Sequence, residues 1–294
     1  MGMANYGNPL LSEAQLEAFY GVAVEGSFTR ATHVLNLSQP ALTRRIQGLE
    51  EALEITLFDR TPQGVALTEA GHKLLLYVKT KRALESEALA DLRGAKEAGE
   101  LGGLIRIAGH SSIIEPVVMP AIAPFLKVNP SVQIEFSVRV NAHLDEMLNY
   151  SKTDFIVANR EGQRKDVVQT LLGEEEFICI ESSSPTSRSH VYLDVDPTDT
   201  ITESFFEAQS NPPKKYARSF MHDENGIMTG VQLGLGRAIK PKHTLKNTDS
   251  IRMVKGFASM KRPVYLRYSR KSYYTRLERA VIEVMEKEVP KILR

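Results

Sequence analysis

The side chains best suited to read another molecule lie in residues 37–47, with the sequence LSQPALTRRIQ. Amide, hydroxyl and guanidinium groups can hydrogen-bond base edges in the major groove of DNA. At helical spacing, such groups are carried by Gln39, Thr43, Arg44 and Gln47. If these positions share the outer face of one helix, the segment has the chemistry of a recognition helix.

A helix over this segment must bury its opposite face to hold the polar side chains outward. Apolar residues recur at intervals of four, three and four, which places them on one side of a helix. Ser38 can cap the first turn, and Pro40 fits within it because its missing N–H costs no hydrogen bond there. The apolar stripe consists of Leu42, Ile46, Leu49 and Leu53.

Residues 27–36 predict a preceding helix that packs on this stripe. Ser27 can cap it, and apolar residues follow at helical spacing. These are Phe28, Ala31, Val34 and Leu35. The period breaks at residues 36–38, which indicates a helix-turn-helix. An ordinary two-helix corner with a solvated polar face fits the periodicity equally well, so the pattern alone leaves both interpretations open.

Three longer segments favour the DNA-binding interpretation. Residues 26–31 (GSFTRA), 37–50 (LSQPALTRRIQGLE) and 57–71 (LFDRTPQGVALTEAG) make residues 11–68 resemble the N-terminal domain of LysR-type transcriptional regulators. The resemblance combines a helix-turn-helix (residues 28–47), a wing hairpin and a following long helix, and it continues more loosely along the chain. Two departures stand out. Thr32 replaces a usual alanine, which predicts slightly looser packing, and Glu54 replaces a frequent glycine, which predicts a less sharp helix end.

The resemblance implies how the domain would contact DNA. The expected base contacts are Gln39, Pro40, Thr43 and Arg44. The expected contacts to the DNA backbone are Ser27, Thr29, Arg30, Ser38, Arg45, Arg60 and Thr61. For the last two, which belong to the wing turn, plain turn residues without a DNA contact are the alternative.

Net charge gives no support for DNA binding. The whole chain has a formal net charge of +1, and residues 11–68 hold four arginines against seven acidic residues, a net charge of −3. A basic average, the usual footprint of a DNA-binding domain, is therefore missing. The arginines are instead placed selectively, in or beside the expected contact face.

Several other functions lack their usual signatures. The single cysteine, Cys179, excludes a disulfide within one chain, and its apolar neighbours predict a buried strand position. No GxSxG, HExxH, phosphate loop or clustered Cys and His residues are present, so we expect neither an enzyme, a metal nor a cofactor. No run approaches the ~20 apolar residues of a membrane span, and no signal-peptide layout is present. We expect a cytoplasmic protein.

The pattern after residue 68 predicts a long helix and then a change of fold class. Residues 69–97 lack proline and carry an irregular apolar repeat, and the family resemblance makes this a linker and dimerisation helix, with a solvated connector as the alternative. Glycine-rich residues 98–103 are the expected hinge. Residues 104–294 then alternate strands and helices, which predicts parallel βαβ units.

The expected fold class is an all-α winged helix-turn-helix domain with a linker helix, followed by an α/β two-lobed domain resembling periplasmic binding proteins. Lobe I would comprise residues 104–160 and 263–294, and lobe II residues 161–262. The chain would cross between the lobes near Glu161 and Arg262. Separate strands are expected at residues 167–172 and 177–180.

A ligand of such a domain binds beyond the carboxyl ends of strands, where helices begin. The candidate effector-binding residues chosen by this rule are Ser111, Ser112, Asn141, His143, Asn159, Arg160 and Asn225. For the two serines, simple helix capping is the alternative. Aromatic residues crowd lobe II and would either wall a pocket or fill it. They are Phe205, Phe206, Tyr216 and Phe220.

Together these features predict a sequence-specific, DNA-binding transcription regulator that responds to a small-molecule effector. Its expected partners are double-stranded operator DNA, other copies of itself in a dimer or tetramer, the effector and RNA polymerase, with no membrane. One alternative is an effector-independent DNA-binding protein with a filled regulatory cleft. Another is a small-molecule-binding protein whose DNA domain is vestigial.

Overall fold

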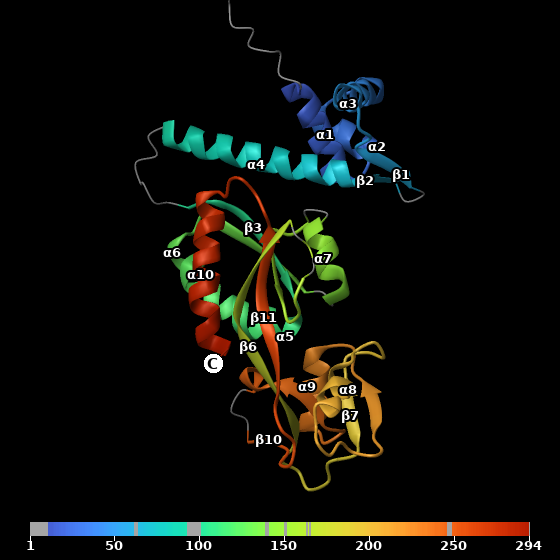
Figure 1. Ribbon diagram of the computed structural model, residues 1–294, viewed down its shortest axis with the longest axis vertical. Helices are drawn as coiled ribbons and strands as arrows, with labels where there is room; N and C mark the ends of the chain where they lie inside the picture. The colour runs from blue at the N-terminus through green and yellow to red at the C-terminus, as the bar shows by residue number, and fades with distance from the viewer. Residues whose placement is uncertain are drawn as a thin grey trace, which may run out of the picture. The chain divides into compact units, whose positions relative to one another are not determined.

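The computed structural model describes residues 11–61, 64–92, 101–138, 141–149, 152–162, 164, 166–245 and 249–293. The chain divides into two compact units (Figure 1). The first unit contains nearly all of residues 1–99, and the second most of residues 100–294. Each unit is described by itself.

Three capped helices form the core of the first unit. They are α1 (Glu13–Glu25), α2 (Phe28–Leu35) and α3 (Gln39–Leu53). Ser12, Ser27 and Ser38 are their N-caps, and each hydroxyl accepts a backbone N–H of the first turn, which would otherwise lack an acceptor. The predicted helix-turn-helix is therefore present, with Pro40 in the first turn of α3.

The apolar stripe of α3 packs as its spacing predicted. Leu42, Ile46 and Leu49 are buried in one cluster with residues of α1 and α2. The expected loosening at Thr32 is accompanied by a local hydrogen bond, because its hydroxyl donates to the carbonyl oxygen of Thr29 at 2.7 Å. The packed face of α3 leaves the opposite face of the helix exposed.

The prediction of a less sharp end for α3 is wrong. Glu54 adopts the left-handed conformation, with φ 55° and ψ 33°, and its N–H donates to the carbonyl oxygens of Glu50 and Glu51. This is the conformation that glycine usually supplies at a helix end. Glutamate can adopt it at a cost of roughly 1–2 kcal/mol, and the hydrogen bonds of the last turn offset that cost.

A wing and a long helix complete the first unit. The wing strands are β1 (Phe58–Thr61) and β2 (Gly64–Leu67), which pair antiparallel. Helix α4 (Glu69–Leu92) follows, and the Thr68 hydroxyl accepts the N–H of Gly71 at 3.0 Å. The predicted continuation of this helix to residue 97 lies outside the described residues.

The second unit is built on a seven-stranded mixed sheet in the order β10-β6-β11-β5-β3-β4, with β9 also paired to β6. Strand β3 (Gly103–Gly109) pairs in parallel with β4 (Val132–Val138) and β5 (Phe155–Ala158). Strands β6 (Val167–Ser182) and β11 (Met260–Ser269) form a long antiparallel ribbon (Figure 1). The remaining strands of the sheet are β9 (Ala238–Pro241) and β10 (Ile251–Met253).

Helices cover both faces of the parallel part of this sheet. Helix α10 (Arg276–Leu293) packs on α6 (Met119–Val128) and on β6, while α7 (Asn141–Asn149) lies on the other side (Figure 1). Before α6, the chain forms α5 (Ser111–Ile113) and a π-helical turn, Ile114–Val118. The segment Ser111–Val128 is long and apolar enough to cross a membrane by composition, but its apolar side chains contribute to the core of this unit.

The second lobe contains a smaller, two-stranded parallel sheet. Strands β7 (Val191–Asp194) and β8 (Ala217–Phe220) pair in parallel. The lobe also contains α8 (Ile201–Glu207), α9 (Glu224–Gln232) and the 3-10 turn η2, Lys242–Thr244. The prediction of separate strands at residues 167–172 and 177–180 is wrong. Residues 173–176 continue the ladder because they pair with β11, so one strand runs through both segments.

Candidate DNA-binding face and candidate effector site

The outer face of α3 presents the polar groups that its periodicity placed there. Gln39, Pro40 and Arg44 are exposed, and Thr43 and Arg45 are half-buried. None of these five side chains has a hydrogen bond or ion pair to a residue within the described part of the chain. These amide, hydroxyl and guanidinium groups are therefore available to base edges and phosphates.

The residues expected to contact the DNA backbone around α2 have local roles as well. The Ser27 hydroxyl accepts the N–H of Arg30 at 3.3 Å, and the Ser38 hydroxyl accepts the N–H of Ala41 at 3.4 Å. The Arg30 guanidinium donates to the backbone carbonyl of Glu25 and pairs with its carboxylate at 3.6 Å. Because its side chain is 65% exposed, this weak surface pair leaves Arg30 accessible. Thr29 is exposed.

Glu50 is a functional residue that the sequence interpretation treated only as one more acidic charge. Its Oε1 accepts the N–H of Leu57 at 2.6 Å and that of Phe58 at 3.3 Å. The carboxylate therefore ties the last turns of α3 to the start of the wing. The side chains of Arg60 and Thr61 lie outside the described residues, although their backbones pair with Val65 and Gly64.

In the second unit, a buried carboxyl group marks the junction of the two lobes. Glu175, on β6, is 0% exposed, and neither carboxyl oxygen has a hydrogen-bond partner. Its nearest charged-group contact is the Nε2 atom of His243, 3.6 Å from Oε1. Burial raises the pKa of Glu175 to about 8, although the charges of Arg262 and Lys240 and the neighbouring Ser112 side chain oppose that rise. The carboxyl is therefore mostly protonated near pH 7.

Two histidines link this group to the first turn of α5. The Nδ1 atom of His110 accepts the N–H of Ser112 at 3.3 Å, and it lies 3.1 Å from the Ser112 hydroxyl. His243 Nε2 donates to the carbonyl oxygen of Ser112 at 3.1 Å. Burial lowers the pKa of both histidines, so both are neutral near pH 7. The accepting role of Nδ1 places the proton of His110 on Nε2.

Two cations approach the same junction with different partners. Lys240 forms an ion pair with Glu224 and is 5% exposed, and burial lowers its pKa to about 8. Arg262 lies opposite Glu175 on β11, and its guanidinium carbon is 5.6 Å from the centre of the Phe177 ring. Arg262 has no side-chain hydrogen bond or ion pair to any residue that the structure describes.

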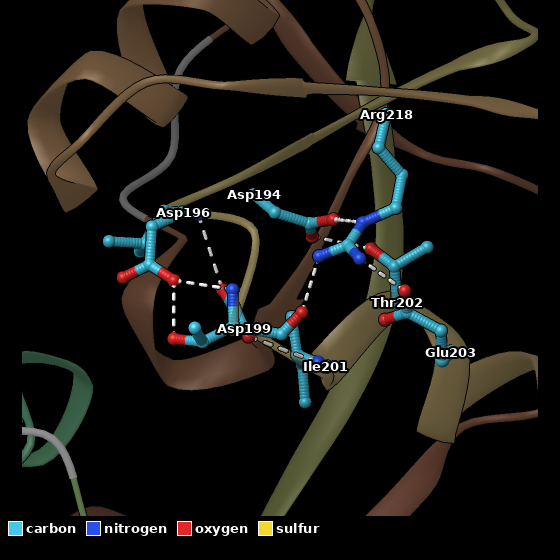
Figure 2. Close-up of polar contacts among 9 residues, drawn as sticks. Asp194, Asp196, Asp199, Ile201, Thr202, Glu203 and Arg218 are labelled. Carbon is cyan, nitrogen blue, oxygen red and sulfur yellow. Dashed lines mark hydrogen bonds and ion pairs between the residues drawn. The ribbon is translucent and has the colours of Figure 1, made fainter.

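A second polar cluster, in lobe II, holds the loop between β7 and α8 (Figure 2). Asp194 is 0% exposed; its Oδ1 accepts the Thr202 hydroxyl at 2.6 Å, and its Oδ2 accepts Nε of Arg218. The same guanidinium donates to Glu203 and to the backbone carbonyl of Asp199. The two oxygens of Asp199 accept the N–H groups at residues 195 and 201.

The residues predicted to bind an effector are only partly brought together. Ser112 lies in the junction cluster, with Ser111 beside it in the same turn. Arg160 instead pairs with Asp145 at 3.4 Å, and Asn225 is exposed in the first turn of α9, with no described contact to Glu175. Asn159 is half-buried at the end of β5. The side chains of Asn141 and His143 lie outside the described residues.

The decisive junction residues escaped the sequence interpretation. Glu175 and Arg262 lie 87 positions apart and meet only because β6 and β11 pair in register. The local sequence carries no signal for this pairing, because Glu175 is the middle of three consecutive glutamates. Within the described part of the chain, no group of three His, Cys, Asp or Glu residues is placed to hold a metal ion.

The aromatic residues of lobe II fill its core. Phe205 and Phe206 are 0% and 4% exposed and pack with Tyr192 and Phe257, while Tyr216 is partly buried beside them. Phe220 is 37% exposed. Cys179 is buried in the same cluster, and burial raises the pKa of its thiol to about 12, so it carries almost no reactive thiolate.

A winged helix-turn-helix joined to a two-lobed α/β domain defines a DNA-binding regulator with a ligand-binding module. Residues 14–72 match the sequence model of the bacterial regulatory helix-turn-helix protein, lysR family, and residues 98–290 match that of the LysR substrate binding domain. The second match alone covers more than half of the chain. The chain therefore belongs to the LysR family of transcription regulators.

Individual relatives support the same assignment. The HTH-type transcriptional regulator YofA of Bacillus subtilis (strain 168) is 26% identical over 251 residues, covering 81% of this chain and 84% of YofA. ArgP from Mycobacterium tuberculosis is similar in structure, with TM-score 0.80, 19% identity and coverage of 95% and 97%. Full-length LysG from Corynebacterium glutamicum, solved with bound effector Arg, has TM-score 0.75, 18% identity and coverage of 96% and 99%. These structural likenesses show the fold.

Proposed function

We propose that the outer face of α3 reads operator sequence and that ligand binding at the junction of the two lobes controls this activity. The observation that carries the DNA-binding part is the outer face of α3. Three exposed and two half-buried residues, four polar and one proline, stand there opposite the apolar stripe, which is buried at Leu42, Ile46 and Leu49. A solved relative, CbnR, is described as complexed with its target DNA. This supports the same activity here.

The contacts fall into two classes with different consequences. Gln39, Pro40, Thr43 and Arg44 contact base edges and set specificity. The backbone contacts position the domain on any duplex. In this proposal they come from Ser27, Thr29, Arg30, Ser38, Arg45, Arg60 and Thr61.

Exposed apolar side chains along α4 support self-association. Tyr77, Leu84 and Leu89 are 50%, 47% and 49% exposed on this helix, and a helix with uncovered apolar side chains gains stability from a partner. We propose a dimer through α4 that presents two recognition helices to two half-sites. A tetramer of two such dimers, action on RNA polymerase and a cytoplasmic location complete the proposal. The chain acts as a regulator rather than as an enzyme.

The effector-responsive part rests on the junction cluster. Buried polar groups are normally hydrogen-bonded, so a buried carboxyl group whose two oxygens form no hydrogen bond by geometry indicates a candidate ligand-binding site. Phe205 and Phe206 pack inside the core of lobe II, whereas Phe177 of the same cluster lies beside Arg262 at the junction. The carboxyl without a geometric hydrogen bond favours effector control over the alternative of a filled regulatory cleft.

The first test compares binding of the full chain to the intergenic duplex beside its own gene with binding to a random duplex of equal length. Over a series of salt concentrations, we expect selective retention of the intergenic duplex and a weaker, steeply salt-dependent binding of the random one. Equal and weak binding of both duplexes would contradict the proposal for this operator.

Variants then separate the two classes of contact. Arg44→Ala should cost about 1–3 kcal/mol at one or two base pairs and relax preference there, whereas Arg30→Ala should weaken binding to all duplexes and flatten the salt slope. Arg188→Ala is the matched control, because it removes an exposed arginine of the other unit. Equal losses on specific and random DNA for both Arg44→Ala and Arg30→Ala would refute the division of roles.

A further inference from the structure

The lobe junction brings five elements around one carboxyl group. Glu175 on β6 lies opposite Arg262 on β11, and the β6–β9 ladder continues toward His243 in η2. Ser112 and His110 approach from α5, and Lys240 from β9. Asp199, before α8, influences Arg262 and Lys240, and Asp194 on β7 influences Lys240.

Most of these groups already have partners. Lys240 pairs with Glu224, both oxygens of Asp199 accept backbone N–H groups, and His243 donates to the Ser112 carbonyl. The groups left over are the Arg262 guanidinium, Nε2–H of His110 and the Glu175 carboxyl. Apart from the Ser112 side chain, which stands beside the Glu175 carboxyl, no side chain of the described residues is bonded to these atoms. Two of the three are donors, and the third is a carboxyl group that donates when it is protonated.

The charges of these groups select the sign of a ligand. With both histidines neutral, Arg262 is the one cation among the described groups of this junction that has no opposite charge bonded to it. A ligand ammonium group would stand close to Arg262 and Lys240, and it would require Glu175 to ionise against its burial. A ligand carboxylate would instead meet a guanidinium, whose fork of N–H donors matches its two oxygens.

We propose that this junction binds the carboxylate group of a small-molecule effector, with Arg262 as its charged partner, His110 as a neutral donor and Glu175 as a protonated donor. The proposal rests on the proposed function and names the chemical class of its ligand. Binding then depends on the protonation of Glu175, because an ionised Glu175 would repel the ligand carboxylate.

The test uses acetate as the probe, with acetamide and ethylammonium as neutral and cationic analogues of similar size. The full chain is titrated with each at one ionic strength, and the dissociation constant is obtained from the rise in melting temperature. We expect stabilisation by acetate and none by the two analogues. No response to acetate, or an equal response to ethylammonium or acetamide, would overturn the proposal.

Variants assign the response to individual groups. Arg262→Gln should weaken acetate binding about tenfold or more, as expected for a lost charge-assisted hydrogen bond. Lys261→Gln is the matched control, since it removes an exposed cation from the adjacent position of β11, where Lys261 pairs with Glu174 at 3.2 Å. An unchanged acetate response in Arg262→Gln, or an equal loss in Lys261→Gln, would overturn the assignment.

Glu175→Gln supplies a second readout that a merely structural role would not move. With a pKa of about 8, Glu175 alone should lower wild-type acetate affinity about fourfold between pH 6.5 and 8.5. Lys240, whose pKa is also about 8, loses charge over the same range, so Glu175→Gln should keep only the smaller fall that Lys240 causes. Loss of binding in Glu175→Gln at both pH values would contradict a donor role. Ligand-free Arg262→Gln should still select operator DNA, so failure of selective DNA binding by the wild type would refute the proposed function alone.

Discussion

Asp194 and Glu175 are both fully buried carboxyl groups of the second unit, and their surroundings are opposite. Both oxygens of Asp194 accept hydrogen bonds, from Thr202 and from Arg218, whereas neither oxygen of Glu175 has a partner. A buried charge is tolerated when it is paired and hydrogen-bonded, and it is costly otherwise. Asp194 therefore belongs to the framework of lobe II, while Glu175 lowers stability and is available for a ligand.

The largest effect should come from breaking the paired group. Asp194→Ala removes the acceptor of the Thr202 hydroxyl and the buried carboxylate that pairs with Arg218, which keeps only Glu203 and the Asp199 carbonyl. We therefore expect a loss of about 3–5 kcal/mol in the free energy of unfolding. Urea unfolding followed by far-UV circular dichroism measures it. The control is Asp196→Ala in the same loop, where the carboxylate accepts from the hydroxyl and N–H of Thr198 at the surface and a much smaller loss is expected. Similar losses for the two variants would remove the distinction between framework and surface carboxylates.

Glu175 should give a smaller effect with a different sign and pH dependence. Its folded pKa of about 8 lies above the unfolded value of 4.5, so the folded state holds the proton more tightly. The resulting stability is fully present below pH 4.5 and is lost as pH rises to about 8, by up to several kcal/mol. We expect Glu175→Gln to flatten this part of the stability–pH profile and to exceed the wild type in stability above pH 8.

The measurement is the urea midpoint of both proteins at intervals from pH 5 to 9. Parallel profiles would mean that Glu175 is ionised at neutral pH, and the contrast with Asp194 would fail. Glu175→Asp is a useful companion variant because it keeps a titrating carboxyl, so its profile should still slope in the wild-type direction.

Prediction from sequence succeeded for features set by local spacing and failed for those set by long-range pairing. Ser38, Pro40 and the stripe ending at Leu53 act within one helix, so local spacing predicted α3 and its two faces. Glu175 and Arg262 depend on a long-range register, and strand β11 was not predicted at all. Glu54 illustrates a third case, in which a residue type argued against a conformation that neighbouring hydrogen bonds nevertheless stabilise.

Glu50 extends the comparison to the DNA-binding unit. Its carboxylate accepts two backbone N–H groups, and Leu57, one of the donors, is 1% exposed. Glu50→Ala should cost about 1–3 kcal/mol because the N–H of Leu57 loses its acceptor in a buried position. Thermal unfolding of the full chain measures the cost, with exposed Glu51→Ala as the control. Equal stability of the two variants would show that the wing is held without this carboxylate.

Glu181 should show the smallest effect and the pH dependence opposite to that of Glu175. Burial pushes its pKa upward, but hydrogen bonds and charges from Arg237 at 2.8 Å and Arg252 at 3.0 Å bring the pKa below its usual value. A depressed carboxyl pKa contributes stability above the unfolded pKa and loses it as pH falls. Glu181→Gln should therefore cost about 1 kcal/mol or less at pH 7 and nothing at low pH.

The comparison of urea midpoints at pH 7 and near pH 4 tests this sign. The wild type should lose its stability advantage over Glu181→Gln as the pH falls. Glu175→Gln should instead lose its own advantage over the wild type across the same range. Salt should reduce the Glu181 effect, because Arg252 is 60% exposed and its pairing is screened. An effect of Glu181→Gln that grows toward acid pH would mean that the two arginines do not stabilise the ionised carboxylate. The pairing of Glu181 and the burial of Glu175 would then not account for opposite pH dependences of stability.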